Sequence, residues 1–240
     1  MKNNLLDIFY DQMKSRIPGQ LYRFTQIDMA YNSNHIEGNS LTYEEIKYIY
    51  DTRLIINNMN IPVDDVIEVA NHFVLFNYML ETATEPLTEA MIKEYHKILK
   101  SGTSDALKPS FMVGGYKILP NSIGGITETT LPEKVEPTMK KLLREYNQLE
   151  KASLKDLVDF HCQFEKIHPF QDGNGRVGRI VLFKECLKHN IMPFIVLDSE
   201  KGFYYQGLKE YPSGTRLLNV FLFFQDKYSI KVNYYLPEMF

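Results

Sequence analysis

Hydrophobic positions along most of the chain recur at the spacing of an α-helix. The segment 41–56 carries apolar side chains three and four residues apart, and Thr42 with Glu45 fits a capping box at its start. The segment 63–80 repeats the same apolar spacing. Both segments are therefore predicted to be amphipathic helices that bury one face.

Capping and turn residues mark where further helices begin. Thr88, Pro132 and Ser153 are suited to the first positions of helices. With them we predict helices over residues 88–99, 132–149, 153–167 and 179–189. Two more are predicted to begin near Ser199 and Ser213, and the C-terminal tail is ambiguous.

One segment breaks the helical pattern. Residues 111–126 read FMVGGYKILPNSIGGI, with two pairs of adjacent glycines around a short apolar run and a Pro-Asn step. Such punctuation is typical of a loop or a short β-hairpin. The predicted fold class is therefore all-α, mainly helical, with one small β-hairpin.

The length and the charge of the chain indicate an ordinary globular protein rather than a nucleic-acid binder. The chain has 240 residues, which suits one large domain or two small ones. Its 27 basic and 30 acidic residues give a net charge of −3, and 44% of the residues are hydrophobic. These values are typical of a globular protein, and they predict no nucleic-acid partner because such binders carry a strongly basic surface.

Cysteine content and hydropathy bear on the compartment. Cys162 and Cys186 are too few for a disulfide scaffold or a four-thiolate zinc site. No apolar run reaches the ~18 residues that span a bilayer. The opening segment, MKNNLLDIFYDQ, lacks the unbroken apolar stretch of a signal peptide. We therefore expect a cytoplasmic protein without a membrane partner.

The segment 168–179, HPFQDGNGRVGR, concentrates residues suited to phosphate chemistry. The glycines that flank Asn174 free the backbone to point successive N–H groups at one anion. A helix follows this loop, and the partial positive charge of its N-terminus also favours phosphate. Arg176 and Arg179 are three residues apart, so that both guanidinium groups can reach the same side of the anion.

Two further side chains of this segment suit group transfer. Asp172 is a hard oxygen ligand for a Mg²⁺ ion that bridges phosphates. His168, followed by the stiff Pro169, is a base that titrates near neutral pH. An enzyme that transfers a phosphate-containing group from a nucleotide to a hydroxyl requires a base, a metal ligand, an anion nest and positively charged side chains such as the two arginines.

The glycines of the segment also allow a competing interpretation. Gly173, Gly175 and Gly178 match the dinucleotide-binding pattern Gly-x-Gly-x-x-Gly. That pattern must follow a strand, whereas the preceding FHCQFEKI has helical spacing. A phosphate-binding loop of the Walker type is also disfavoured, because no Gly-Lys-Ser/Thr is present.

The segment resembles the signature of the Fic family, which reads HPF, an acidic residue two positions later, GNGR and a further arginine. The resemblance implies a Fic fold over residues 60–210, an N-terminal helical region at 1–59 and a C-terminal helical extension at 211–240. It also implies an enzyme that transfers AMP from ATP to a Ser, Thr or Tyr hydroxyl of a target protein and releases pyrophosphate.

The same resemblance assigns roles to individual residues. His168 would take the proton from the attacking hydroxyl, and Asp172 would hold Mg²⁺ on the α- and β-phosphates. Arg176 and Arg179 would steady the β- and γ-phosphates. The family's kinase-like branch has lysine at position 175, so glycine there favours nucleotidyl transfer. The ATP-binding residues implied in this segment are Gly173, Asn174, Gly175, Arg176, Val177, Gly178 and Arg179.

Two other segments extend the resemblance. Residues 116–125 resemble the family's flap, a hairpin that aligns a target segment by backbone pairing. Tyr204 and Tyr205 match aromatic positions that flank the adenine, although the asparagine that the family often has eight residues after the first tyrosine is Pro212 here. On the residues alone, the tyrosine pair is interpreted as packing. The flap residues implied to close on the nucleotide are Asn121, Ser122, Ile123 and Gly124.

Residues 33–39, SNHIEGN, fit the family's inhibitory motif Ser/Thr-x-x-x-Glu-Gly/Asn. On the residues alone this pattern indicates only a helix end with Glu37 in solvent. Together with the Fic signature it predicts that Ser33 and Glu37 share one helical face and that Glu37 forms a bidentate pair with Arg179. That pair would occupy the guanidinium needed by the γ-phosphate and tilt ATP away from productive geometry.

The remaining histidines and both cysteines are interpreted as structural. His161 lies seven residues before His168, but no third metal ligand accompanies the two. His72, His96 and His189 fall in helical segments and are predicted to pack or to face solvent. Cys162 and Cys186 are predicted to be small buried apolar groups.

The sequence thus predicts an autoinhibited, Mg²⁺-dependent protein adenylyltransferase whose partners are ATP and a protein target, which can be the chain itself. Two alternatives stay open. The first is a hydrolase that removes AMP with Glu37, since the same glutamate positions water in some relatives. The second is a nucleotide-sensing regulatory module, against which the intact His168 argues. Whether the chain forms a homo-oligomer also stays open.

Overall fold

The computed structural model describes residues 4–55, 60–123, 127–212 and 214–237. The described chain is mainly helical, as predicted, and two short strands form one hairpin. The helices are α1 (Leu5–Ser15), α2 (Leu21–Ile36), α3 (Tyr43–Thr52), α4 (Val63–Glu81), α5 (Glu89–Lys100), α6 (Pro132–Tyr146), α7 (Leu154–Ile167), α8 (Asn174–Lys188), α9 (Lys201–Glu210) and α10 (Arg216–Tyr235).

The hairpin lies where the paired glycines predict it. Strands β1 (Ser122–Ile123) and β2 (Thr127–Glu128) run antiparallel, with Ser122 opposite Glu128 and Ile123 opposite Thr127. Short 3₁₀ turns at Ser104–Leu107 and Asp198–Glu200 complete the regular structure of the described residues.

Several helix ends differ from the predicted ones for local reasons. Helix α3 stops at Thr52, short of residue 56, because Arg53 turns into the left-handed region with φ of 60° and its N–H donates to the Ile49 carbonyl. Helix α6 stops at Tyr146 rather than 149, where the Asn147 side chain donates to the Leu87 carbonyl. The ambiguous tail continues α10 as far as Tyr235.

Helix α8 begins at Asn174, earlier than the predicted start at Arg179. Gly173 supplies the turn before it with a φ of 82°, a left-handed conformation that favours glycine. The Asn174 side chain then accepts from the Phe170 N–H at 2.7 Å and donates to the Phe170 carbonyl at 2.8 Å. These bonds close the loop so tightly that the chain enters the helix at once.

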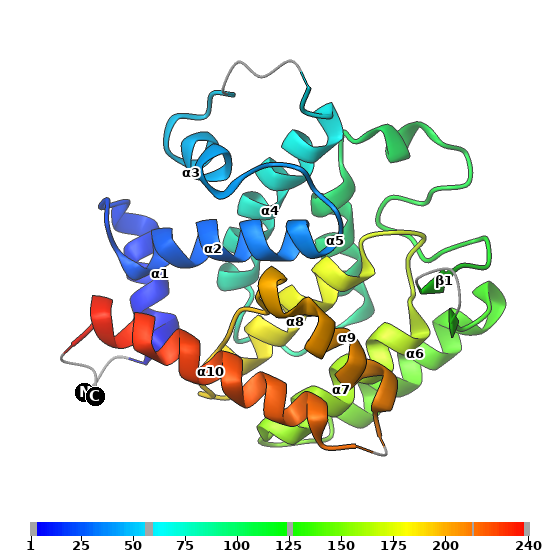
Figure 1. Cartoon of the computed structure of the whole chain (residues 1–240). Helices are drawn as coiled ribbons and strands as arrows, with labels where there is room; N and C mark the ends of the chain where they lie inside the picture. The colour runs from blue at the N-terminus through cyan, green and yellow to red at the C-terminus, as the bar shows by residue number, and fades with distance from the viewer. Residues whose placement is uncertain (1–3, 56–59, 124–126, 213, 238–240) are drawn as a thin grey trace.

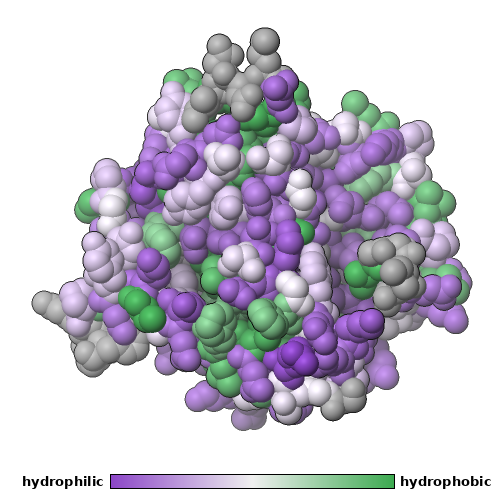
Figure 2. Space-filling view, in the orientation of Figure 1, coloured by the Kyte–Doolittle hydropathy of each residue, from purple (hydrophilic) through white to green (hydrophobic). Residues whose placement is uncertain are grey.

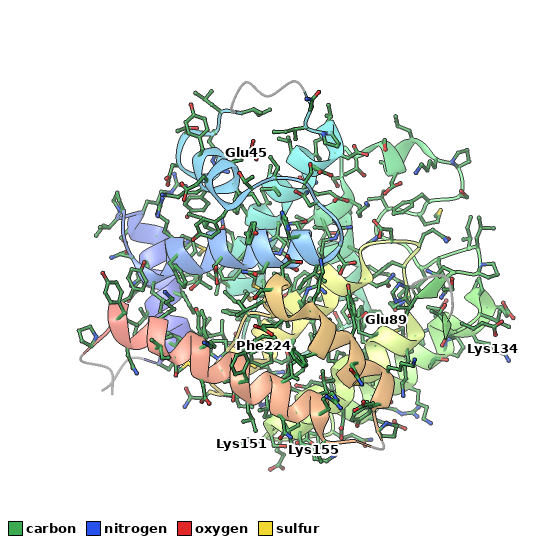
Figure 3. The ribbon with its side chains drawn as sticks, in the orientation of Figure 1. Glu45, Glu89, Lys134, Lys151, Lys155 and Phe224 are labelled. Carbon is green, nitrogen blue, oxygen red and sulfur yellow. The ribbon has the colours of Figure 1, made fainter. Side chains whose placement is uncertain are left out.

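One hydrophobic core extends from Leu5 to Val232 and draws on all three predicted regions of the chain. Helices α4, α5, α7 and α8 pack against one another at its centre, while α10 lies against α9 and α7. Phe224 of α10, which is labelled in Figure 3, is 1% exposed and belongs to this core. A smaller cluster fills the space between α2, α3 and α4.

Helix α2 lies across α4, and its C-terminal end reaches the start of α8 (Figure 1). Its middle buries apolar side chains such as Ile27 and Met29, but its last turns bury the polar Asn32, Ser33 and Asn34. Polar groups at that depth require hydrogen-bond partners. The end of α2 is therefore held largely by polar contacts.

Apolar side chains gather on the surface over α9 and α10, as the green area in the lower centre of Figure 2 shows. Phe203, Leu222 and Phe223 are 57%, 44% and 43% exposed there. None of the helices in the described ranges is both long enough and apolar enough to cross a membrane.

The contact between α7 and α8 depends on Gly178. A Cβ at this position would lie 2.5 Å from Glu165 Oε1 and 3.2 Å from His161 Cε1, whereas a Cβ at Gly202 in α9 would meet no atom within 4 Å. We expect Gly178→Ala to lower the free energy of unfolding by about 1–3 kcal/mol through overpacking. The matched Gly202→Ala should raise it by about 0.4–1 kcal/mol. Urea unfolding of both variants measures the difference, and equal effects would contradict this account of the packing.

Candidate active site

His168 occupies a strained position at the end of α7. This helix starts with the predicted capping box, in which Ser153 accepts from the Asp156 N–H, and it ends where His168 adopts a left-handed conformation with φ of 51°. A non-glycine residue in this region is uncommon and costs energy. At this turn the His168 side chain is 19% exposed, so that the imidazole remains partly accessible to solvent.

The hydrogen bonds of His168 leave one ring nitrogen available as a base. Its Nδ1 lies 3.2 Å from the Glu165 carbonyl oxygen, which can only accept, so Nδ1 carries the proton and Nε2 keeps its lone pair. Burial lowers the pKa of His168, and the nearby Lys117 lowers it further, although the Glu165 carbonyl acts in the opposite direction. The imidazole is therefore neutral at pH 7.

A stack of aromatic rings fixes the loop after His168. Phe170 is fully buried, and its ring lies parallel to that of His96 with the centroids 4.0 Å apart. The Gly114 N–H donates to His96 Nδ1 at 3.0 Å, so His96 Nε2 carries the proton and donates to the Asp172 carbonyl at 3.1 Å. His96 thus joins the loop to the segment before the hairpin. From the sequence, His96 was expected only to pack or to face solvent.

Asp172 is held by two cations. Its Oδ2 accepts from Lys100 Nζ at 2.8 Å and from an Arg176 guanidinium nitrogen at 3.0 Å, and half of its side chain is exposed. Burial alone would raise the pKa of Asp172, but Arg176 and Lys100 outweigh it and hold the pKa well below its usual range. The carboxylate is ionised at neutral pH.

Lys100 lies at the centre of a group of acids that the sequence did not reveal. Its ammonium is 2.6 Å from Glu68 Oε1 and 2.6 Å from Asp105 Oδ2, in addition to the contact with Asp172. One oxygen from each of these three carboxylates lies within 4.8 Å of the others. The ammonium offsets part of their negative charge, Arg176 offsets more through Glu68 and Asp172, and the Lys100 side chain is only 2% exposed.

The two arginines of the loop have different surroundings. Arg176 is 3% exposed and pairs with Glu68 and Asp172 beneath the loop, and its Nε has no partner among the described residues. Arg179 points toward α2, where Nε donates to Ser33 Oγ at 2.9 Å. Its second nitrogen donates to the Ser33 carbonyl at 2.8 Å and to Glu37 Oε1 at 2.6 Å.

The predicted pairing of Glu37 with Arg179 is therefore present, but it uses one carboxylate oxygen rather than two. Ser33 accepts two further hydrogen bonds from the guanidinium. Glu37 also stands at the C-cap of α2, with Gly38 in the left-handed region behind it. The helix-end interpretation and the pairing thus describe the same residues.

Gly175 gives Glu37 room to reach Arg179. A Cβ at position 175 would overlap Glu37 Oε1 and lie 2.9 Å from an Arg179 nitrogen. Position 175 is already helical, so its glycine serves close approach, and the turn itself is made by Gly173. Val177 and Gly178 face the interior, where Val177 packs in the core and Gly178 contacts α7.

The hairpin lies against the same loop. Asn121 Nδ2 donates to the Phe170 carbonyl at 2.9 Å, and the Ser122 and Ile123 main chain forms β1. Gly124, the fourth predicted flap residue, lies outside the described residues.

The two tyrosines of α9 differ in burial. Tyr204 is 1% exposed, and its hydroxyl lies 2.8 Å from His161 Nε2. Tyr205 is 41% exposed, and its hydroxyl donates to the Ile36 carbonyl at the end of α2. Tyr204 therefore packs in the core, as the residues alone predict, while Tyr205 lies beside the end of α2.

Glu165 is a further residue of the site that the sequence did not predict. Its carboxyl is buried 3.9 Å from His168 Nδ1 and 3.9 Å from His161 Nε2, and Oε1 has no hydrogen-bond partner among the described residues. Burial raises the pKa of Glu165 to about 8, although Arg179 opposes the shift. The carboxyl is thus mostly protonated at pH 7. His161, Cys162 and Cys186 are buried, as expected of packing residues.

Comparison with known proteins agrees with this geometry. Residues 86–185 match the model of the Fic/DOC family. This segment is similar to a Fic domain. A probable protein adenylyltransferase of Aquifex aeolicus is 31% identical over 136 residues, which cover 56% of this chain and 40% of the relative. The protein adenylyltransferase Fic of Nematostella vectensis is 25% identical over 191 residues, which cover 75% of this chain and 42% of the relative.

Solved structures share the Fic fold. A Fic domain-containing signaling protein from Bacteroides thetaiotaomicron superimposes with a TM-score of 0.73 at 24% identity, covering 98% of this chain and 94% of that one. Fic-1 from Caenorhabditis elegans gives a TM-score of 0.69 at 20% identity, covering 97% and 70%. The chain spans about two fifths of the length of the two curated relatives described above.

The surroundings of the histidines predict how they titrate. Burial lowers the pKa of His72, His96 and His161 to about 3, and it lowers that of His168. In imidazole NMR spectra we expect the first three to stay neutral between pH 5 and 8 and His168 to titrate below the unfolded value of about 6.5. Since the unfolded chain then binds more protons than the native chain, these groups should lower stability as pH falls below about 6.5. A His168 midpoint above 6.5, identified by its loss in His168→Gln, would contradict the burial argument.

Proposed function

We propose that this chain is an autoinhibited, Mg²⁺-dependent protein adenylyltransferase, which transfers AMP from ATP to a side-chain hydroxyl of a target protein. The observation that carries the proposal is the meeting of three groups in one loop. A neutral imidazole, an ionised carboxylate and the N-terminus of α8 lie within residues 168–176. The names of the curated relatives support the same activity.

His168 supplies the base in this proposal. Its Nε2 lone pair takes the proton of the target hydroxyl while the hydroxyl oxygen attacks the α-phosphorus of ATP, and the bond to the pyrophosphate oxygen breaks. The Glu165 carbonyl holds the Nδ1 proton throughout, which keeps the ring in the required tautomer. The depressed pKa favours the neutral ring before the reaction.

The start of α8 suits the phosphates. The first intrahelical bond of α8 runs from the Val177 N–H to the Gly173 carbonyl. The N–H groups of Asn174, Gly175 and Arg176 precede that bond, and such groups have no partner within a helix. Together with the helix dipole they form an anion site. Arg176 contributes from beneath, because its contacts with Glu68 and Asp172 align the loop.

The donor set suits one Mg²⁺ ion at Asp172. This side chain is ionised and half exposed, and Mg²⁺ is commonly bound by one carboxylate together with substrate phosphate oxygens and water. Lys100 pairs with Glu68 and Asp105 as well as with Asp172, but the side chains of Glu68 and Asp105 are only 11% and 19% exposed, against 50% for Asp172. When bound, the ion would neutralise charge on the phosphates.

The contact between α2 and α8 supports autoinhibition. Arg179 is the arginine of the loop that faces α2, and its Nε and one terminal nitrogen donate to Ser33 and Glu37. A γ-phosphate that needs this guanidinium would have to displace Glu37, or ATP would bind in a geometry that is poor for in-line attack. Glu37 would thus lower the rate without preventing binding.

Labelling with ATP tests the proposal directly. We expect Glu37→Gly to raise the incorporation of label from α-labelled ATP and Mg²⁺ by about tenfold or more, since a charged hydrogen bond contributes about 1.5–3 kcal/mol. His168→Ala in the same background should abolish the label because the base is lost. The exposed Glu44→Gly is the matched control and should behave as wild type. Equal labelling of Glu37→Gly and Glu37→Gly/His168→Ala would exclude His168 as the base.

The same assay separates the alternative functions. A hydrolase that uses Glu37 would release AMP from a premodified target as wild type and not as Glu37→Gly. A sensor would bind ATP and change its oligomeric state without label in any variant. Applied to a cell lysate, the assay identifies the labelled target proteins.

Metal dependence gives a separate prediction. In the Glu37→Gly background we expect excess EDTA to stop labelling and Mg²⁺ to restore it. Asp172→Asn should weaken Mg²⁺-dependent ATP binding, measured by calorimetry, about tenfold or more, since the outer ligands of a metal alone are worth about 10–100-fold. Asp226→Asn on α10 serves as the control. ATP affinity that is independent of Mg²⁺ in both proteins would contradict the assignment of Asp172.

A further inference from the structure

Lys117 lies buried at the base of the hairpin. Only 3% of Lys117 is exposed. Its main-chain N–H donates to the carbonyl of Pro169, the residue after His168, at 2.9 Å. Within the described part of the chain, no carboxylate lies within ion-pair distance of its ammonium. Buried lysines normally pair with an acid, so this one needs another explanation.

The ammonium has three neutral acceptors instead. Lys117 Nζ donates to Asn121 Oδ1 at 2.6 Å, to Thr129 Oγ1 at 2.6 Å and to the Ile167 carbonyl at 3.4 Å. Thr129 in turn donates to Asn121. The three acceptors match the three N–H bonds of a protonated lysine, whereas a neutral amine has only two donors.

These acceptors belong to three separate parts of the site. Asn121 directly precedes β1, Thr129 directly follows β2, and Ile167 directly precedes His168. One ammonium therefore joins both ends of the hairpin to the turn at residues 167–169, which contains His168 and is called the catalytic turn below. Asn121 adds a second link, because its Nδ2 donates to the Phe170 carbonyl.

The segment before Lys117 is anchored as well. The Tyr116 hydroxyl donates to Glu89 Oε1 at 2.9 Å, and the Lys93 ammonium lies 4.0 Å from the centre of the Tyr116 ring. Both partners belong to α5, and Glu89 is labelled in Figure 3. With one side fixed to α5, the ammonium contacts determine where the hairpin base sits relative to His168.

We propose that Lys117 is a positioning residue for AMP transfer, whose protonated ammonium holds the base of the hairpin against the catalytic turn and so sets the distance from a target strand to His168. The proposal rests on the proposed function, since it concerns the target of the same site. It assigns Lys117 to alignment of the target rather than to binding of ATP.

Protonation of Lys117 makes this contact sensitive to pH. Burial lowers the pKa of Lys117 to about 8, and its three hydrogen-bond acceptors, on Asn121, Thr129 and Ile167, do not titrate. His168 is the titratable neighbour on the turn, and Lys117 lowers its pKa. As pH rises through about 8, the amine loses one donor and leaves one acceptor unsatisfied. Alignment of the target should therefore weaken on the alkaline side.

Exchange of the hairpin amides tests the contact without any assay of activity. In wild type, Lys117→Met and the exposed Lys134→Met, amide exchange is measured by NMR at Ser122, Ile123 and Glu128. We expect about tenfold faster exchange in Lys117→Met and no change in Lys134→Met, because only the former removes the ammonium. Lys117→Arg keeps a cation and should restore part of the protection. Such recovery would show that the faster exchange in Lys117→Met is not caused by general unfolding.

Kinetics test the alignment itself. In the Glu37→Gly background, with a degenerate peptide library centred on Ser, Thr or Tyr, we expect Lys117→Met to raise the KM for peptide about tenfold while the KM for ATP stays constant. The KM for peptide should rise above pH 8 in Glu37→Gly, and Lys117→Arg should remove this limb. An ATP KM that changes equally would assign Lys117 to the nucleotide and overturn the proposal.

Two results distinguish this proposal from the function on which it rests. If the hairpin amides exchange equally in wild type and Lys117→Met, Lys117 does not position the hairpin, whatever the labelling shows. If the amides respond but Glu37→Gly carries no label, the adenylyltransferase assignment has failed instead. An NMR titration of the labelled Lys117 side chain with a midpoint near its usual 10.5 would overturn the pH dependence.

Discussion

The guanidinium of Arg179 connects two segments that are far apart in the sequence. Its three hydrogen bonds to Ser33 and Glu37 join the end of α2 to the first turns of α8. Because the arginine is buried, its charge requires a nearby anion, and Glu37 is the acid that reaches it. The position of the last turn of α2 and the need for a glycine at position 175 both follow from this contact. An ATP phosphate would compete for the same donors.

A second set of charges beneath the loop has a different task. Arg176 and Lys100 share Glu68 and Asp172, so that two cations and two acids compensate one another inside the fold. Breaking such a set leaves an uncompensated buried charge, which is costly. Arg176 therefore maintains the shape of the loop, while Arg179 stands at its boundary. Of the two arginines in this motif, one supports the loop and the other contacts α2.

The sequence predicted those parts of the site that lie close together along the chain. His168, Asp172 and the start of α8 fall in one loop, so their spacing alone brings them together. The contact of Arg179 with Ser33 spans 146 positions and was predictable only because a second motif marks Glu37. Lys100, Glu68 and Lys117 carry no local signal. A lysine or glutamate on a helix or loop is usually solvated, and only the packing of α4 against α5 and of the hairpin against the catalytic turn buries these three.

The polar end of α2 has a consequence for reversibility. Asn32, Ser33 and Asn34 are buried there, where an apolar helix face would be expected. Separating apolar faces costs free energy in proportion to the area exposed to water, whereas amide and hydroxyl groups recover hydrogen bonds from the solvent. Lifting the last turn of α2 from Arg179 would thus uncover one buried apolar side chain, Ile36, together with these polar groups. The middle of the helix is docked separately through Ile27 and Met29, so its packing does not depend on the last turn.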